Sequence, residues 1–519
     1  MTKEQEKQII AFINAGAELA NVENYSDAMA EFNKALELDP INYIALAYIG
    51  KTFFFTGNPF GQELVAKRLV KYHPDKTEGY KHFGQCYHKM SRIKESVDIL
   101  KIAVQKHPKD PVLVPNLLFH LNSMALPMNE VFQMHRKYAA NYEPRPVLPR
   151  PPFPKTQKIK VGFVSSDYCA HSVCYFLFSL FEIYDRERFE FHLFSNTGHC
   201  NYDRITETYK QLAIWQDISG LSDKEAAKLI KKEQISVLFD LNGYTTAPVR
   251  MGIFGQRPAP VQISWLGYPN TTGMKSMDFR ITDNYADSPE ADKYYTEKLL
   301  RFNTPFLCYS PSVMAKSIYL EFAEKAENEP LIFGSFNNTT KITDETIFLW
   351  CAVLKRVPNS RMYLKSKAFN DPKMYNYYLE KFTNTGIEKE RIEIKGHSLF
   401  EKDHLIEYLK IDIALDTIPY NGTTTTCEAM FMGVPTLALM GESHVARVSA
   451  ALNSQAGFAE FVAKTEQEFV EIAEFWAAHK KELCEYKNSM REKMLASPLC
   501  NPKMFTEEWE RIVSSLLPA

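Results

Sequence analysis

A threonine-rich segment at 416–430, DTIPYNGTTTTCEAM, contains residue types that suit the binding of a phosphate group. Asn421-Gly422 favours a tight turn, and Thr423 to Thr426 supply hydroxyls and caps before a helix that the pattern CEAMFM begins. The first N–H groups of a helix are unpaired and carry about half a positive charge, which suits an anionic diphosphate. Glu428, one turn in, could accept hydrogen bonds from ribose hydroxyls. An ordinary capped helix gives the same pattern and remains the alternative.

The sequence lacks the common phosphate-binding motifs, so another group must supply the positive charge for a departing diphosphate. The chain has neither G-x-x-x-x-G-K-[ST] nor G-x-G-x-x-G, and it lacks a D-x-D pair that could hold a metal on a sugar diphosphate. Protein cations and helix dipoles are therefore expected to neutralise a diphosphate. Lys341, which follows FGSFNNTT, is the candidate donor of that charge, and a solvated surface lysine is the alternative.

The elements that must position these residues are parallel β-sheets. From residue 158, short apolar runs such as KIKVGFV, FEFHLFS and ISVLFD alternate with amphipathic stretches, and after residue 329 the pattern restarts with LIFGS, RMYLK, RIEIK, IDIAL and VPTLAL. Such alternation predicts two doubly wound α/β domains, at 158–328 and 329–497, with a cleft between them. Ligands bind at the carboxyl ends of such strands, where VSSDYCAHSVCYF, LNGYTT, LGYPNTTG and the threonine-rich segment lie.

The front of the chain carries an internal repeat. At an offset of 34 residues, positions align as Gly16, Gly50 and Gly84; Leu19, Phe53 and Tyr87; Ala35, Leu69 and Ala103; and Pro40, Pro74 and Pro108. This spacing resembles three tetratricopeptide repeats, which are helical hairpins that stack into a surface for peptides or proteins. We expect the repeat domain to span 1–143, with its last helical segment, 111–142, as a capping unit. A Pro-rich linker at 144–157 follows, and an amphipathic helix at 498–519 ends the chain.

The composition excludes several classes of function. The 61 Lys and Arg residues nearly balance 63 Asp and Glu residues, so a net charge of −2 gives no global reason to bind nucleic acid or a membrane surface. Nine cysteines without a C-x-x-C pair predict reduced thiols and no zinc site. The charged start MTKEQEKQII shows neither a secretory signal nor a membrane span. The expected compartment is cytoplasmic.

Taken together, these strings resemble the SPINDLY and O-GlcNAc transferase family, the GT41-type protein glycosyltransferases. The matching strings are HSVCYF, NGYT, RPAPVQISWLGYPNTTG, FRITD, FGSFNNTTKIT, VPNSR, IDIALDTIPYNGTTTTCEAMFMGVP and SPLCN. The resemblance covers nearly the whole chain. It implies a GT-B fold, in which two Rossmann-like halves face a cleft, behind an all-α tetratricopeptide superhelix, and it implies that the last helix packs back on the first half.

The resemblance also implies a metal-independent, inverting transfer of a sugar from a nucleotide diphosphate sugar to Ser or Thr of target proteins held by the repeats. No cofactor is implied beyond UDP-GlcNAc or GDP-fucose as co-substrate. Several strings are closer to the SPINDLY branch, which uses GDP-fucose in plants, and Thr423 stands where the animal enzymes have a His, so the donor stays open. A homodimer through the repeats is also left open.

By the same resemblance, Lys341 contacts the diphosphate and His171 is either a general base or an orienting residue. The implied nucleotide-sugar residues are Asn338, His404, Asn421, Gly422, Thr423, Thr424, Thr425 and Glu428. The implied sugar and acceptor side of the cleft has Gly243, Tyr244, Pro269, Asn270 and Thr271. The Asn-x-Thr triplets that start at Asn270, Asn338 and Asn421 are interpreted as cleft-facing loops. Two alternatives remain: glucosylation of Asn in sequons, and an inactive transferase-like scaffold.

Overall fold

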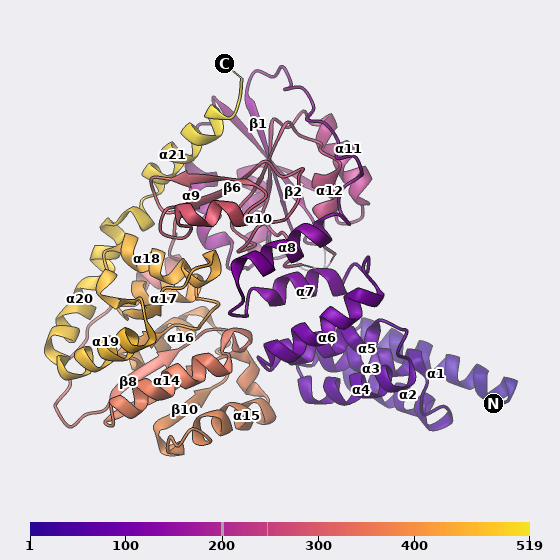
Figure 1. Cartoon of the computed structure of the whole chain (residues 1–519), viewed down its shortest axis with the longest axis horizontal. Coiled ribbons are helices and arrows are strands. Elements are labelled where there is room, and N and C mark those ends of the chain that lie inside the picture. The colour runs from indigo at the N-terminus through magenta and orange to yellow at the C-terminus, as the bar shows by residue number, and fades with distance from the viewer. Residues whose placement is uncertain (199–201, 247, 519) are drawn as a thin grey trace.

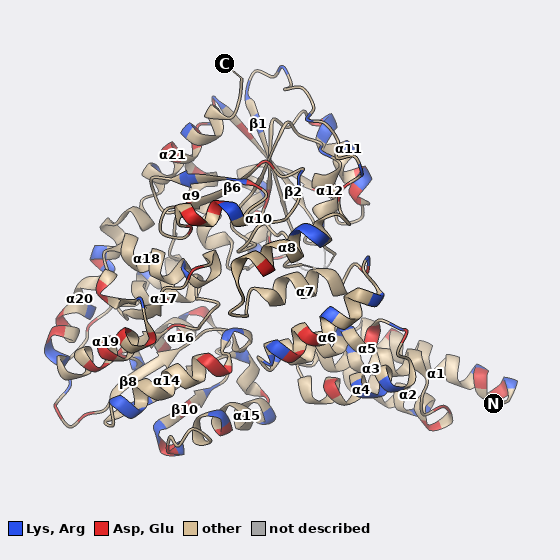
Figure 2. Ribbon diagram, in the orientation of Figure 1, with Lys and Arg blue, Asp and Glu red and all other residues tan. Residues whose placement is uncertain are grey.

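The computed structural model describes residues 1–198, 202–246 and 248–518. A helical arm leads from the N-terminus to two α/β halves, and the C-terminal helix runs back along the first half (Figure 1). Lys and Arg alternate with Asp and Glu on the outer helices, whereas the strands of both sheets carry few charges (Figure 2). In the part of the chain that is described, no helix combines the length and apolar character that crossing a bilayer needs.

The arm consists of three helical hairpins. Their helices are α1 (Lys3–Asn21), α2 (Tyr25–Leu38), α3 (Tyr43–Phe55), α4 (Pro59–Tyr72), α5 (Glu78–Lys89) and α6 (Ile93–Lys106). The glycines that recur every 34 residues lie where helices touch: a Cβ at Gly16 would lie 2.5 Å from the Phe32 ring, and one at Gly84 would lie 2.9 Å from Leu100. The recurring glycines therefore allow the paired helices to pack closely, since a larger side chain would separate them.

The helices expected to cap the repeats do not end in solvent. Helices α7 (Leu113–Leu121) and α8 (Met128–Ala139) share one hydrophobic core with the first α/β half. In that core, Leu117, Leu118 and Leu121 are fully buried. A Tyr268 hydroxyl from the first half also hydrogen-bonds to His135 Nε2 of α8 at 2.6 Å. Because α7 is apolar around most of its circumference and is covered from both sides, the segment expected to cap the repeats also joins them to the first half.

The first half contains a seven-stranded sheet in which every pair of neighbours is parallel, in the order β3-β2-β1-β4-β5-β6-β7. The strands are β1 (Ile159–Ser165), β2 (Phe189–Ser195), β3 (Ile214–Asp217), β4 (Val237–Asp240), β5 (Val261–Ser264), β6 (Phe279–Asp283) and β7 (Lys298–Phe302). Its helices are α9 (Cys174–Ile183), α10 (Arg204–Leu212), α11 (Asp223–Lys232), α12 (Met251–Gly255) and α13 (Val313–Ser317). Strands β1, β2, β4 and β5 are the continuous apolar runs of the sequence, whereas the edge strand β3 is short and partly exposed.

The second half contains a six-stranded parallel sheet in the order β10-β9-β8-β11-β12-β13. The strands are β8 (Leu331–Ser335), β9 (Ser360–Lys365), β10 (Ile392–Lys395), β11 (Ile413–Leu415), β12 (Thr436–Leu439) and β13 (Val462–Ala463). The helices are α14 (Asp344–Arg356), α15 (Pro372–Thr383), α16 (Glu401–Ile406), α17 (Thr424–Phe431), α18 (Val448–Ala456) and α19 (Glu466–Ala478). In both halves the order of strands reverses beside the first strand, which creates the crevice where ligands bind in such folds.

Two C-terminal helices tie the halves together. Helix α20 (Lys480–Ala496) packs on α17, and α21 (Pro502–Ser515) then crosses to the first half and packs on α9. The buried Trp509 ring lies 5.5 Å from the rings of both Phe239 and Phe191, measured between centroids. One hydrophobic core contains residues of both halves and of α21, so buried apolar contacts join the two halves.

Candidate functional site

A cavity of about 460 Å³ lies between the two α/β halves, and helix α7 of the repeat side supplies part of its wall. Strand-end loops of the first half contribute His171, Thr245 and Pro269. Loops of the second half contribute Lys341 and the threonine-rich segment, and α7 contributes Phe119. The Phe119 ring lies edge-on to Tyr420, with centroids 6.3 Å apart, so all three parts of the chain meet at this cavity.

The threonine-rich segment forms the expected turn and helix start. Helix α17 begins at Thr424, three residues before the expected CEAMFM start, and Thr423 caps it without a side-chain hydrogen bond. Thr423, Thr424 and Thr425 line the cavity. The Gly422 N–H donates to the buried Asp416 carboxylate at 2.8 Å. A Cβ at Gly422 would lie 2.6 Å from the Thr425 hydroxyl oxygen, so a larger residue would force the neighbouring side chains of this close turn to move.

Asn421 lines the cavity, but its side chain stabilises its own loop. Its Nδ2 donates to the Thr417 carbonyl at 3.0 Å, and the residue is almost fully buried. The backbone carbonyl of Asn421 accepts from Lys341. Asn421 therefore orders the loop, with its side-chain amide turned toward the protein.

Lys341 ends a short 3-10 turn, Thr339–Lys341, directly after β8. Its Nζ donates to the Asn421 carbonyl at 2.8 Å and lies 4.1 Å from the centre of the Tyr420 ring. Burial lowers the pKa of Lys341 from 10.5 to about 8, and the Asp416 carboxylate acts in the opposite direction. Asn338 caps the same turn by accepting from the Thr340 N–H at 3.1 Å, and it also lines the cavity. A partly buried ammonium group therefore lies beside the start of α17.

His404 and Glu428 lie behind that helix start and form a chain with Lys365. Lys365 Nζ is 2.6 Å from His404 Nδ1, and His404 Nε2 is 3.3 Å from a Glu428 carboxylate oxygen. The Tyr408 hydroxyl donates to the same carboxylate at 3.2 Å. Glu428 is thus already paired within the protein. Burial lowers the pKa of Lys365 to about 8.

Sequence reasoning missed Lys365, although a signal was available. The residue ends the apolar strand β9 in the string RMYLKSK, and strand ends of this kind are where ligand-binding residues are expected. Asp167 and Asp416 carry the same signal, because they lie just after the ends of β1 and of β11.

His171 lies on the opposite side of the cavity, in the loop after β1. Its side chain is about half exposed, and its Nδ1 is 3.6 Å from an Asp167 carboxylate oxygen. Burial raises the pKa of Asp167, while His171 acts to lower it. The Asn242 side chain donates to Asp167 at 2.6 Å and fixes the carboxylate. His171 and Asp167 form a histidine–carboxylate pair that faces the second half.

The residues expected on the sugar and acceptor side divide into two groups. Pro269 lines the main cavity, and Asn270 lines a smaller cavity at the junction with the repeats. The structure corrects the other three, which are in the core and do not line the main cavity. They are Gly243, at φ +55° against the Tyr268 side chain; Tyr244, whose hydroxyl donates to the Thr272 carbonyl; and Thr271, whose hydroxyl donates to Glu297.

A physical reason explains this correction. The aromatic Tyr244 side chain packs against α8 through a core that the repeat pattern did not reveal. The next residues of the same loop, Thr245 and Thr246, reach the cavity instead. Tyr268 is likewise fully buried, whereas Tyr420 lines the cavity.

Comparison with known proteins agrees with this arrangement. The family model "Glycosyl transferase family 41" matches residues 125–319 and 322–509. The protein from Petunia hybrida named "Probable UDP-N-acetylglucosamine--peptide N-acetylglucosaminyltransferase SPINDLY" is 36% identical over 363 residues, which cover 69% of this chain and 39% of that protein. The Arabidopsis thaliana protein of the same name is 36% identical over 350 residues, covering 67% of this chain and 38% of that one. The chain therefore spans about two fifths of the length of these curated relatives.

A solved structure resembles nearly the whole chain. It is the K341M mutant of the Thermobaculum terrenum O-GlcNAc transferase, with a TM-score of 0.89 and 27% sequence identity, and the match covers 99% of this chain and 98% of that one. The helical repeats and both halves of the cleft are therefore shared. Because the family model matches most of the length of this chain, the chain belongs to glycosyl transferase family 41.

Proposed function

We propose that this protein transfers a sugar from a nucleotide diphosphate sugar to a Ser or Thr hydroxyl of a protein target, with inversion at the anomeric carbon. One observation carries the proposal: the Lys341 ammonium and the start of α17 lie on one wall of a cavity whose opposite wall holds His171. A diphosphate fits beside the ammonium and the unpaired N–H groups, which places its sugar toward the first half.

The proposed chemistry follows from this charge distribution. The acceptor oxygen attacks the anomeric carbon, the bond from that carbon to the diphosphate oxygen breaks, and the electron pair leaves on the diphosphate. Fixed donors at the developing charge each contribute about 3 kcal/mol by analogy with oxyanion holes. Lys341 and the first turn of α17 are the donors in this site. We propose that they suffice without a metal ion, so that a chelator leaves transfer unchanged.

His171 completes the proposed site from the acceptor side. An imidazole can either accept the hydroxyl proton or orient the acceptor, and the Asp167 carboxylate at 3.6 Å stabilises the protonated ring. The target protein approaches from the repeats, because Phe119 of α7 forms part of the cavity wall. The co-substrate we propose is UDP-GlcNAc or GDP-fucose, and a thermal-shift panel of both sugars with UDP and GDP separates them.

The test is the Lys341→Ala variant. Loss of one charged donor is expected to reduce transfer by about 100- to 1000-fold while the folded structure is retained. The matched control is Lys94→Ala, which removes an exposed ammonium group on α6 and is expected to keep full activity. Full transfer by Lys341→Ala would overturn the proposal, and mass spectrometry that locates the sugar on Asn would overturn the hydroxyl acceptor.

A further inference from the structure

His444 is a buried histidine that neither the sequence motifs nor the chemistry above uses. It begins a short turn, His444–Ala446, between β12 and α18 of the second half, and only 4% of it is exposed. It lines the same cavity as Lys341 and His171, and also the small cavity that Asn122 and Asn270 line at the junction with the repeats. It therefore lies where all three parts of the chain converge.

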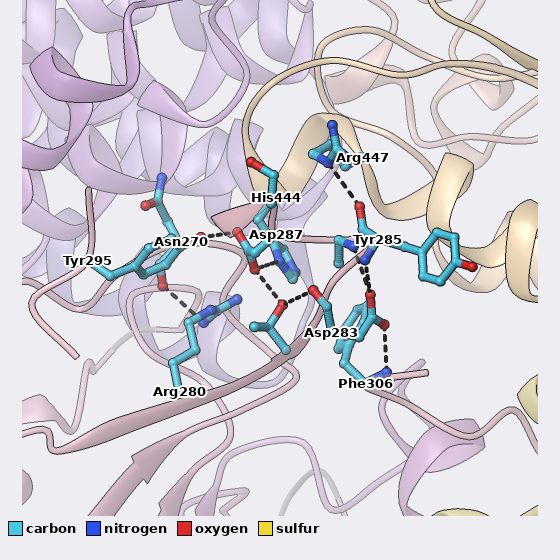
Figure 3. A network of polar contacts seen from close by, with 12 residues as sticks. Asn270, Arg280, Asp283, Tyr285, Asp287, Tyr295, Phe306, His444 and Arg447 are labelled. Carbon is cyan, nitrogen blue, oxygen red and sulfur yellow. Dashed lines mark hydrogen bonds and ion pairs between the residues drawn. The ribbon is translucent and has the colours of Figure 1, made fainter. Parts of the chain in front are cut away.

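Its ring is held by a carboxylate from the opposite half. Nδ1 is 2.7 Å from an oxygen of Asp287, which follows β6 and is fully buried (Figure 3). The Tyr295 hydroxyl donates to the other Asp287 oxygen at 2.8 Å, and the Thr282 hydroxyl donates to the one that faces His444. The Phe306 ring lies edge-on to the imidazole, with centroids 5.1 Å apart. The orientation of the ring is thus fixed by residues of the first half, across the cleft from His444.

These contacts also set which nitrogen carries the proton. Burial by itself would raise the pKa of Asp287, but His444 and then Arg280 hold it well below its usual range, so the carboxylate stays ionised and accepts hydrogen bonds only. Nδ1 of His444 is consequently the donor. In the neutral ring, Nε2 then carries the lone pair and is an acceptor. Within the described residues, Nε2 makes no hydrogen bond, so an acceptor nitrogen without a partner belongs to a residue that lines the cavity.

The neighbouring backbone shows which part of a co-substrate would meet it. The Val445 carbonyl accepts from the Asn421 N–H at 3.0 Å, and the Asn421 carbonyl accepts from Lys341. His444 is therefore next to Val445, which is hydrogen-bonded to the loop beside which the diphosphate is proposed to lie. Diphosphate oxygens are acceptors at neutral pH and cannot bond to an acceptor nitrogen, whereas a sugar hydroxyl can donate to it.

We propose that His444 is a sugar-binding residue of the donor site, which accepts a hydrogen bond from a hydroxyl of the transferred sugar, and that Asp287 of the opposite half is its positioning residue. This inference rests on the proposed function, since it needs a nucleotide sugar in the cavity. It explains why a buried histidine–carboxylate hydrogen bond bridges the two halves beside the site: the donor sugar is recognised only when both halves are in place.

The test is His444→Asn. An Asn side chain can still donate to Asp287 from near the Nδ1 position, but it has no atom at the position of Nε2. Isothermal titration with UDP, GDP, UDP-GlcNAc and GDP-fucose is expected to show unchanged affinity for the nucleotide that the wild type binds and about three- to tenfold weaker affinity for its sugar conjugate. The matched control is His479→Asn, a histidine in the same half that lies outside the cavity lining and is expected to change neither affinity.

Other outcomes overturn the inference. Equal weakening of nucleotide and nucleotide sugar would mean that the pair only joins the halves, and unchanged affinity for both would mean that Nε2 touches no sugar. If His444→Asn fails to fold, nitrogen NMR of the wild-type imidazole replaces it: Nε2 must shift with the nucleotide sugar but not with the nucleotide alone, and no difference refutes the contact. A wild type that binds neither UDP nor GDP would overturn the proposed function itself, and this inference with it.

Discussion

The affinity of this protein for a nucleotide diphosphate should fall steeply in mildly alkaline solution. Burial lowers the pKa of Lys341 to about 8, so this ammonium group is charged below that pH and neutral above it. Because the shift is downward, the attraction for the diphosphate is present at pH 7 and lost as the pH rises through about 8. An unperturbed lysine, with a pKa of about 10.4, would keep its charge throughout this range.

The size of the effect follows from the charged fraction of the free protein. With a pKa of about 8, about nine tenths of Lys341 is charged at pH 7 and about one tenth at pH 9. If binding needs the ammonium form, the affinity falls about tenfold over this interval, or about 1.4 kcal/mol. The assay is isothermal titration of UDP or GDP, whichever binds, across this interval. The Lys341→Arg variant should show no such fall, because guanidinium stays charged.

Lys365 provides the matched control, because burial also lowers its pKa to about 8 but it bonds to His404 outside the cavity lining. Lys365→Arg should therefore keep the alkaline fall. If the fall persists in Lys341→Arg and disappears in Lys365→Arg, the reasoning about Lys341 is refuted and the titrating charge is at Lys365.

Two further predictions concern the scaffold. Trp509→Ala empties a fully buried site between the first sheet and α21, and it should lower the free energy of unfolding, measured in urea, by about 3–5 kcal/mol. The control Met504→Ala, on the exposed side of the same helix, should have little effect. Equal stability of both variants would contradict the packing role of Trp509. The buried apolar residues of 1–41 belong to the cluster of the first two hairpins. Deletion of residues 1–41 should therefore leave the melting temperature of the α/β halves unchanged, and it should reduce transfer to protein targets more than transfer to short peptides. Equal loss of transfer to both would contradict target binding by the repeats.

Much of the fold could be predicted from the sequence because the determining patterns are local. The 34-residue repeat of Gly16, Gly50 and Gly84 records close helix contacts, and continuous apolar runs record strands that are buried on both faces. Loops at strand ends were likewise predictable, which is why His171, Lys341 and the threonines line one cavity. The direction of individual side chains in those loops was not, because Tyr244 and Thr271 turn toward partners more than 20 residues away.

The contacts between separate parts of the molecule could not be predicted from the sequence. Asp287 and His444 are 157 residues apart, and Asn122 and Asn270 are 148 apart, yet each pair is within hydrogen-bond distance. Neither pair has a spacing that periodicity could show, since each depends on how two separately folded units dock. A single His or Asn on an apolar background is, by its sequence, an ordinary buried residue. Only the docking reveals that His444 turns one nitrogen to a carboxylate of the other half, while its second nitrogen makes no hydrogen bond within the described residues. In the role proposed for His444, recognition of the sugar therefore depends on assembly of the cleft.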